Sequence, residues 1–503
     1  MKKYLLGVDN GGTYIKAAIY DKKGKRLGIA RQYNEVLKPK PGRTEYDQEK
    51  LWEINCNCIK NVITETGVDP NEIACIGIAG QGCGFYAVDR FGKSIRNAIT
   101  SADARAEEIV EQWKKDGTDK KAYSKIYRHS SPVHLNALLA WLKKYEPENY
   151  AKIGYLFSMK DFLAFRFTGN AIAGQGCQSV SGLMDLSKGE FSKELGILFG
   201  IEEMTDKFGR LCWDFEEAGR LTSEAALQCG CVQGTLVAAG SHDVIASALA
   251  MGILDSRLCF MITGTHGING YISNEPILNG TIKYNEYFAF PGQFLIEEGY
   301  PTSSGTLEWV ITTLYADRQE KSSDLYDEIN HNVESVNPDS SNLLFLPFLQ
   351  GNRDNPDAAG TWIGLRPEHT RAHMLRAVYE GVAFSHLLQM EHLFANREKP
   401  EIIRMAGGAT ASRVWIQIFA DVFGIPIEIV PNEEMGTKGA AIVGAVTSGL
   451  YRDVREAVNE MTQQGEIFYP IEDNFKIYQK KIAVFKKIVE NLDPLWCAYG
   501  REE

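Results

Sequence analysis

The 503-residue chain has no apolar stretch long enough to cross a membrane and no excess of positive charge. Its 54 Lys and Arg residues stand against 65 Asp and Glu, a formal net charge of -11. This balance excludes the basic surface that nucleic acids and anionic membranes attract, so we expect neither as a partner. The first apolar stretch is too short for a secretory signal, and we expect none.

Paired C-x-x-C motifs are also missing. The 10 cysteines are scattered, and the C-x-C pairs Cys56/Cys58 and Cys229/Cys231 have no second ligand pair at the spacing of a zinc finger. The sequence therefore predicts reduced thiols in a cytoplasmic protein, and neither disulfides nor a structural zinc site.

What the chain does contain is an ordinary globular composition, with 44% hydrophobic residues. Its length exceeds that of one hydrophobic core and predicts two domains of comparable size. Apolar strands alternate with helical patterns along the whole chain, which indicates a mixed α/β fold. An apolar helix expected over Val244 to Met251 marks the boundary, giving domains of residues 1–250 and 251–503.

Two segments about half a chain apart share the order strand, Gly/Thr-rich turn, strand. In the first, residues 4–8 lead to Asp9, the turn is 10–13, and residues 15–20 run back. In the second, residues 258–262 lead into the turn 263–267. Glycines let backbone N–H groups approach an oxyanion, and a threonine hydroxyl adds a donor. Either could be only a tight hairpin, but the duplication favours two turns that bind the phosphates of one nucleotide.

A third glycine turn follows the strand expected at 402–405. It reads Gly407-Gly408-Ala409-Thr410 and precedes an amphipathic helix. This order brings a helix N-terminus close to a nucleotide, although a plain strand-to-helix turn has the same pattern.

The segment Gly360-Thr-Trp-Ile-Gly-Leu365, with His373-Met374 and Ala377-Val-Tyr-Glu380 after it, fits the second signature of the FGGY family of carbohydrate kinases. With the turns at Asp9, Thr263, Gly407 and Gly439 in family order, the chain is identified as a member of that family. The resemblance implies a two-domain actin-like ATPase fold, ribonuclease H-like in each half, with an interdomain catalytic cleft. It assigns sugar binding to residues 1–250 and nucleotide binding to residues 251–503.

Within the family, three segments resemble bacterial L-xylulose kinases: 79–84, 301–309 and 371–386. The implied reaction uses ATP and Mg²⁺ to convert L-xylulose to L-xylulose 5-phosphate. Another pentulose, erythritol and 3-keto-L-gulonate are the alternative substrates, and a catalytically idle sugar sensor is the distant alternative. ATP and a small sugar are thus the expected partners, and a homodimer is left open.

Phosphoryl transfer to a sugar hydroxyl requires a carboxylate near that hydroxyl and neutralisation of phosphate charge. Asp243 follows a strand end and is the candidate catalytic base, where the resemblance also places it; the alternative is a cap for the helix after it. Asp9, with Asp243, is expected to hold Mg²⁺, and its alternative is a simple turn carboxylate.

The resemblance also implies the remaining ligands. The residues expected to bind ATP are Gly11, Gly12, Thr13, Lys16, Gly264, Thr265, Gly267, Gly305, Gly408, Ala409 and Ser412. Those expected to bind the sugar are Gln81, Asp103, Arg105 and Asp243. The alternative for Lys16 is a solvated lysine on the hairpin. The alternative for Arg105 is an exposed residue in the first turn of a helix. His242 and His266 are interpreted as structural histidines and are not included.

The chain departs from the family pattern at several places. Ser101 stands where many relatives have Trp, Gly82-Cys83 where D-xylulose kinases have Met-His, and Val244 where a polar residue is common. The first family signature is weak around Trp141-Leu142. These departures argue against D-xylulose or glycerol as the substrate but keep the kinase interpretation.

Overall fold

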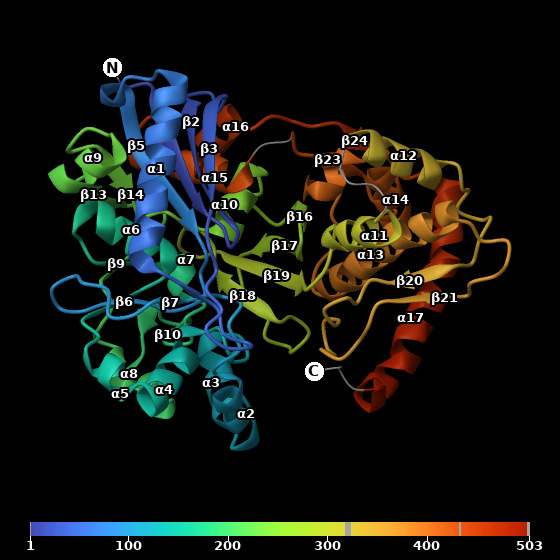
Figure 1. Ribbon diagram of the computed structural model, residues 1–503, viewed down its shortest axis with the longest axis horizontal. Coiled ribbons are helices and arrows are strands. Elements are labelled where there is room, and N and C mark those ends of the chain that lie inside the picture. Colours follow the sequence, from blue (N-terminus) through green and yellow to red (C-terminus); the bar gives the residue numbers. More distant parts are fainter. Residues whose placement is uncertain (1, 317–322, 432–433, 500–503) are drawn as a thin grey trace. The chain divides into compact units, whose positions relative to one another are not determined.

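The computed structural model describes residues 2–316, 323–431 and 434–499. The chain divides into two compact units, each an α/β assembly (Figure 1). The first comprises Met1–Leu254, Ile272–Leu295 and Glu433–Gln463, and the second comprises Asp255–Tyr271, Ile296–Asn432 and Gln464–Glu503. A segment late in the sequence therefore belongs to the first unit.

The first unit is built on a mixed sheet with the order β13-β14-β5-β1-β2-β3, in which β15 also pairs with β5. Strands β1 and β2 form the predicted antiparallel hairpin, and β1 runs parallel to β5. The strands are β1 (Tyr4–Asn10), β2 (Tyr14–Asp21), β3 (Arg26–Tyr33), β5 (Ile73–Gly80), β13 (Glu217–Arg220), β14 (Leu236–Ala238) and β15 (Ser241–His242).

Helix α15 (Met435–Thr447) packs unusually close to one face of this sheet. A Cβ added at Gly7 would lie 2.0 Å from the carbonyl oxygen of Thr437, and one at Gly77 would lie 1.8 Å from that of Ala440. Real Cβ atoms do not approach this closely, so the contact requires glycine at both sheet positions. The helix is thereby held directly against β1 and β5.

The other face of the sheet carries the main hydrophobic core. Successive side chains of a strand point to opposite faces, so Leu6 and Val8 point away from α15. They join a buried cluster with Leu51 and Ile59 of α1 (Gln48–Thr66). Asp47 caps α1 by accepting hydrogen bonds from the backbone N–H groups of residues 49 and 50.

Further elements complete the first unit. Its other helices are α2 (Glu107–Lys115), α3 (Thr118–Ile126), α4 (Leu135–Tyr145), α5 (Pro147–Ala151), α6 (Met159–Thr168), α7 (Gln175–Gln178), α8 (Lys193–Leu198), α9 (Ser223–Cys229), α10 (Asp243–Ala250) and α16 (Val454–Met461). Its short strands are β4 (Glu45–Tyr46), β6 (Tyr86–Val88), β7 (Ala98–Ile99), β8 (Tyr155–Phe157), β9 (Ile172–Gly174), β10 (Met184–Asp185), β11 (Glu190–Phe191), β12 (Arg210–Cys212) and β18 (Tyr284–Tyr287).

The second unit repeats the plan of a central sheet with helices around it. Its strands follow the order β19-β17-β16-β22-β23-β24, and β16 pairs antiparallel with β17 and parallel with β22. The strands are β16 (Cys259–Thr263), β17 (Gly267–Ser273), β19 (Phe294–Tyr300), β22 (Ile403–Gly407), β23 (Ile427–Ile429) and β24 (Ile467–Phe468), with a separate pair β20 (Leu344–Leu346) and β21 (Thr361–Ile363). The helices are α11 (Gly305–Leu314), α12 (Ser323–Glu334), α13 (Arg371–Phe394), α14 (Arg413–Phe423) and α17 (Glu472–Tyr499).

None of the helices in the described ranges is both long and apolar enough to span a membrane. The cysteines whose side chains are described, among them Cys229 and Cys231, are free thiols.

Candidate active site

Asp243, the candidate base, lies where two parallel strands of the first unit end side by side. Strand β15 pairs with the end of β5, so that Ser241 lies opposite Ala79 and His242 opposite Gly80. Asp243 then begins α10, one residue earlier than predicted, and its Oδ1 accepts a 2.8 Å hydrogen bond from the backbone N–H of Val244. The side chain is 34% exposed, so a ligand can reach it.

Asp9 lies one residue before the end of β1 in the same unit and is near three charged groups. Burial raises the pKa of its carboxyl to about 7; Lys16 opposes this shift, and the carboxylates of Asp243 and Glu434 add to it. Lys16 Nζ forms an ion pair with Glu434 at 2.5 Å. The structure therefore brings together Asp9, Asp243 and Lys16, whose roles stay predictions, and adds Glu434, which the sequence analysis did not identify.

The carboxylates of Asp9 and Asp243 suit Mg²⁺. This ion prefers oxygen ligands and is usually held by one or two carboxylates together with substrate phosphates. In the part of the chain that the structure describes, no group of three or more His, Cys, Asp or Glu side chains is arranged to hold a metal without a substrate. The pKa of Asp9 is raised by burial and, to a smaller extent, by the nearby carboxylate of Asp243. Such a pair of carboxylates fits a cation that arrives with the nucleotide.

Hydrogen bonds from buried side chains hold the first glycine turn, which lies beside a predicted sugar ligand. The buried side chains of Asn10 and Asn55 exchange two hydrogen bonds, of 3.1 and 2.9 Å. The hydroxyl of Tyr46 donates to the carbonyl oxygen of Gly12 at 2.7 Å. A Cβ at Gly12 would lie 3.1 Å from Nε2 of Gln81, so the structure brings Gly12 and Gln81 together.

The other predicted sugar ligands, Asp103 and Arg105, form a buried ion pair. Arg105 Nε lies 2.8 Å from Asp103 Oδ1, with side chains 1% and 0% exposed, and Nη2 lies 2.9 Å from Glu45 Oε1. Helix α2 begins at Glu107, so the alternative that Arg105 is an exposed first-turn residue is wrong. Their contact with a sugar remains a prediction.

In the second unit, four of the predicted ATP ligands meet around the second turn. A Cβ at Gly305 would lie 3.1 Å from the carbonyl oxygen of Thr265. Ser304 Oγ donates to the carbonyl oxygen of Gly264 at 2.9 Å, and it lies 2.9 Å from a Cβ added at Gly408. The N-terminus of α11 is thus packed directly onto the turn, and helix N-termini are suited to binding anions such as phosphate.

A cavity of about 270 Å³ adjoins this turn and contains Gly408 and Ser412. Asn330 of α12 projects into it, and its Oδ1 accepts hydrogen bonds from Ser412 Oγ at 2.6 Å and Tyr379 Oη at 3.0 Å. These bonds fix the amide so that its NH₂ group is the one available to a ligand. The cavity is lined by Ser304, Leu307, Glu308, Tyr326, Asn330, Tyr379, Gly408, Ala411, Ser412 and Trp415.

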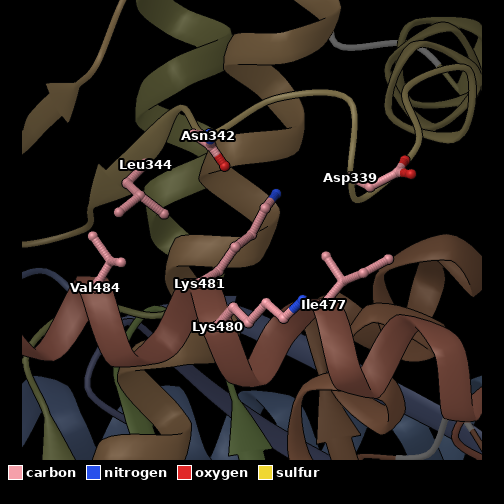
Figure 2. A pocket seen from close by; sticks show the side chains of 7 residues that line it. All are labelled: Asp339, Asn342, Leu344, Ile477, Lys480, Lys481 and Val484. Carbon is pink, nitrogen blue, oxygen red and sulfur yellow. The ribbon is translucent and has the colours of Figure 1, made fainter.

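Another cavity of the second unit, of about 460 Å³, contains none of the predicted site residues (Figure 2). Lys480, Lys481, Ile477 and Val484 line it from α17, opposite a segment with Asp339. Lys481 is paired with Glu380 at 2.8 Å. Its lining has none of the glycine turns that characterise the site described above.

Comparisons with known proteins bear on the family and the fold of the chain. Residues 4–250 match the N-terminal domain, and residues 259–448 the C-terminal domain, of the FGGY family of carbohydrate kinases. The chain is 34% identical to an L-xylulose/3-keto-L-gulonate kinase of Escherichia coli (strain K12) over 98% of each chain. It is 33% identical to a probable L-xylulose kinase of Haemophilus influenzae, over 98% of this chain and 99% of that one. The solved structure of a ligand-bound xylulose kinase from Lactobacillus acidophilus superposes with a TM-score of 0.91 at 24% identity, covering 99% of this chain and 100% of that one.

Proposed function

Because the chain belongs to the FGGY family of carbohydrate kinases, we propose that it transfers the terminal phosphoryl group of ATP to L-xylulose, giving L-xylulose 5-phosphate and ADP. The observation that carries this proposal is the partly exposed carboxylate of Asp243, which follows β15 and lies close enough to Asp9 of β1 to contribute to its raised pKa; β15 and β1 both pair with β5. The names of the E. coli and H. influenzae relatives support the choice of sugar.

Asp243 accepts the proton of the terminal hydroxyl as that oxygen attacks the phosphorus. Both Val244 N–H and a neighbouring imidazole contact Oδ1, which leaves Oδ2 as the oxygen that faces the acceptor. A base held in one orientation contributes mainly by aligning the attacking oxygen, since phosphoryl transfer depends on in-line positioning.

The phosphates are bound by groups of the two glycine turns. We assign Gly11, Gly12 and Thr13 of the first turn, and Gly264 and Thr265 of the second, to phosphate oxygens through backbone N–H groups and hydroxyls. Lys16 supplies a positive charge next to them. Asp9 and Asp243 would hold Mg²⁺, which would neutralise part of the charge on the phosphates.

The nucleoside occupies the cavity of about 270 Å³ beside Gly408. Tyr379 and Trp415 stack at 4.1 Å and give the cavity a rigid aromatic wall. The amide NH₂ of Asn330 donates to an acceptor atom of the base, and Ser412 lines the same cavity. Ala409, also predicted to bind ATP, is fully buried and is not part of this lining.

The E. coli relative's name also includes 3-keto-L-gulonate, which is the second candidate acceptor. A cytoplasmic location, a homodimeric state and the domain boundary at residue 250 stay predictions.

The test is ADP release from Mg²⁺-ATP by the purified chain with L-xylulose, D-xylulose, L-ribulose, D-ribulose, erythritol, glycerol and 3-keto-L-gulonate. The proposal predicts the highest kcat/KM with L-xylulose. A higher value with another acceptor would change the substrate and keep the mechanism, and no turnover with any would contradict the kinase assignment.

A further inference from the structure

A chain of charged side chains continues from Asp243 into the interior of the first unit. The imidazole of His242 lies between two carboxylates: Nε2 is 3.2 Å from Asp243 Oδ1, and Nδ1 is 3.0 Å from Glu286 Oε1. Nδ1 forms a hydrogen bond with Glu286; because carboxylate oxygens accept, the ring donates to both neighbours when both of its nitrogens carry a proton. The ring orientation is thereby fixed by Glu286, with its other edge against the candidate base.

The absence of a side chain at Gly82 leaves space for the imidazole of His242. A Cβ added there would lie 2.9 Å from His242 Nε2 and 3.1 Å from two ring carbons. Any side chain at position 82 would therefore move the imidazole.

Glu286 is itself held in place. Its side chain is 0% exposed, and its second oxygen lies 3.7 Å from Nη2 of Arg128, an ion pair that offsets the cost of burying the charge. The same Nη2 donates to the carbonyl oxygen of Asn285 at 2.8 Å. Arg128 follows Tyr127, whose φ of 55° makes it the one non-glycine residue with positive φ in the described ranges. Such strain is retained where the surrounding structure demands the conformation.

We propose that His242, anchored by Glu286, is a positioning residue that holds the Asp243 carboxylate with Oδ2 toward the sugar hydroxyl. The inference rests on the proposed function, because it assumes that Asp243 is the base. The backbone N–H of Val244 bonds the same oxygen that His242 contacts, so two groups on different elements restrain one carboxylate. The prediction is a loss of kcat when the ring is removed or displaced, with little change in the binding of ATP.

The experiment is a double-mutant cycle on steady-state kinetics with L-xylulose. His242→Ala is expected to lower kcat about 10- to 100-fold, the effect of a small misplacement of a reacting group, while KM for ATP changes less than about twofold. Gly82→Ala should lower kcat in the wild-type background and have no further effect in the His242→Ala background, because the displaced ring is then absent. His242→Gln, which can still bond Glu286 and approach Asp243, should recover part of the loss.

Three comparisons make the outcome decisive. His392→Ala, a half-buried histidine on α13 of the second unit, is the matched control and should keep wild-type kcat. Wild-type kcat in His242→Ala, or additive effects of the two substitutions in the cycle, would overturn the positioning role. Asp243→Asn is measured in parallel: if it retains turnover, the base assignment fails, whereas an inactive Asp243→Asn with an unaffected His242→Ala refutes only the positioning role. Should His242→Ala fail to fold, Gly82→Ala and His242→Gln still test the same contact.

Discussion

A Cβ added at Gly436 would lie 2.4 Å from the carboxylate of Asp9. The first turn of α15 therefore lies directly against the candidate metal and phosphate site, although the two residues are separated by most of the sequence. Because helix N-termini carry partial positive charge, this placement favours negative charge on Asp9 and on a nearby phosphate. The glycine is needed so that the helix can approach this closely.

Gly436→Ala is expected to displace Asp9 or tilt α15, and so to lower kcat/KM for ATP by about tenfold or more. Gly444→Ala is the matched control on the same helix, since its Cβ would meet Cys75 at 3.4 Å and the backbone nitrogen of Gly77 at 3.5 Å, which are ordinary contacts. Steady-state kinetics and the melting temperature of both variants check the prediction. Equal activity in the two variants would show that the contact with Asp9 does not matter.

Lys16 is expected to bind phosphate when ATP is present. Lys16→Met should raise KM for ATP about 10- to 150-fold, because a charge-assisted hydrogen bond contributes roughly 1.5 to 3 kcal/mol. Its ion pair with Glu434 involves side chains 24% and 29% exposed, so the change in stability should stay below about 1 kcal/mol. Lys23→Met, on the exposed turn after β2, is the control. An unchanged KM for ATP would leave Lys16 as a hairpin lysine paired with Glu434.

Asn330→Ala should weaken nucleotide binding and leave sugar binding intact. The substitution removes the NH₂ donor, so an acceptor atom of the bound base loses its partner, at a cost of roughly 1 to 3 kcal/mol in binding. The hydroxyls of Ser412 and Tyr379 lose their acceptor in the free and in the bound protein alike, which lowers stability rather than affinity. Titration calorimetry with ADP should show Kd raised by about 5- to 100-fold. Asn332→Ala on the same helix removes only a bond to Glu328 of its own helix and should bind ADP normally. A normal Kd for Asn330→Ala would exclude the cavity as the nucleoside site.

The sequence predicted the local parts of this site well and the long-range parts poorly. Both hairpins have the predicted strands, because a strand and its turn are specified by apolar residues and glycines that lie within a few positions of one another. The partnership of Lys16 with Glu434, the approach of Gly436 to Asp9 and the bond between Ser412 and Asn330 were not predicted. These contacts depend on how distant segments pack, and no periodicity in a single sequence specifies that.

His386 of α13 should make the second unit sensitive to acid. Burial lowers the pKa of its imidazole to about 3, whereas the unfolded chain titrates near 6.5. Between these values the unfolded chain binds more protons, so the free energy of unfolding falls as the pH drops, by about 1.4 kcal/mol per pH unit for one such group. Urea unfolding at pH 7, 6 and 5 should show a smaller loss in His386→Gln than in the wild type. If the free energy of unfolding falls with pH equally in His386→Gln and in the wild type, the lowered pKa of His386 is contradicted.

The central claim is that Asp243 activates the terminal hydroxyl of L-xylulose. The most direct measurement is phosphorus NMR of the products formed from Mg²⁺-ATP and L-xylulose by the wild type and by Asp243→Asn, with nucleotide affinity measured alongside. We predict L-xylulose 5-phosphate and ADP from the wild type, and at least about a 100-fold slower reaction from a variant that still binds ADP. Product formation by Asp243→Asn at the wild-type rate would contradict the account.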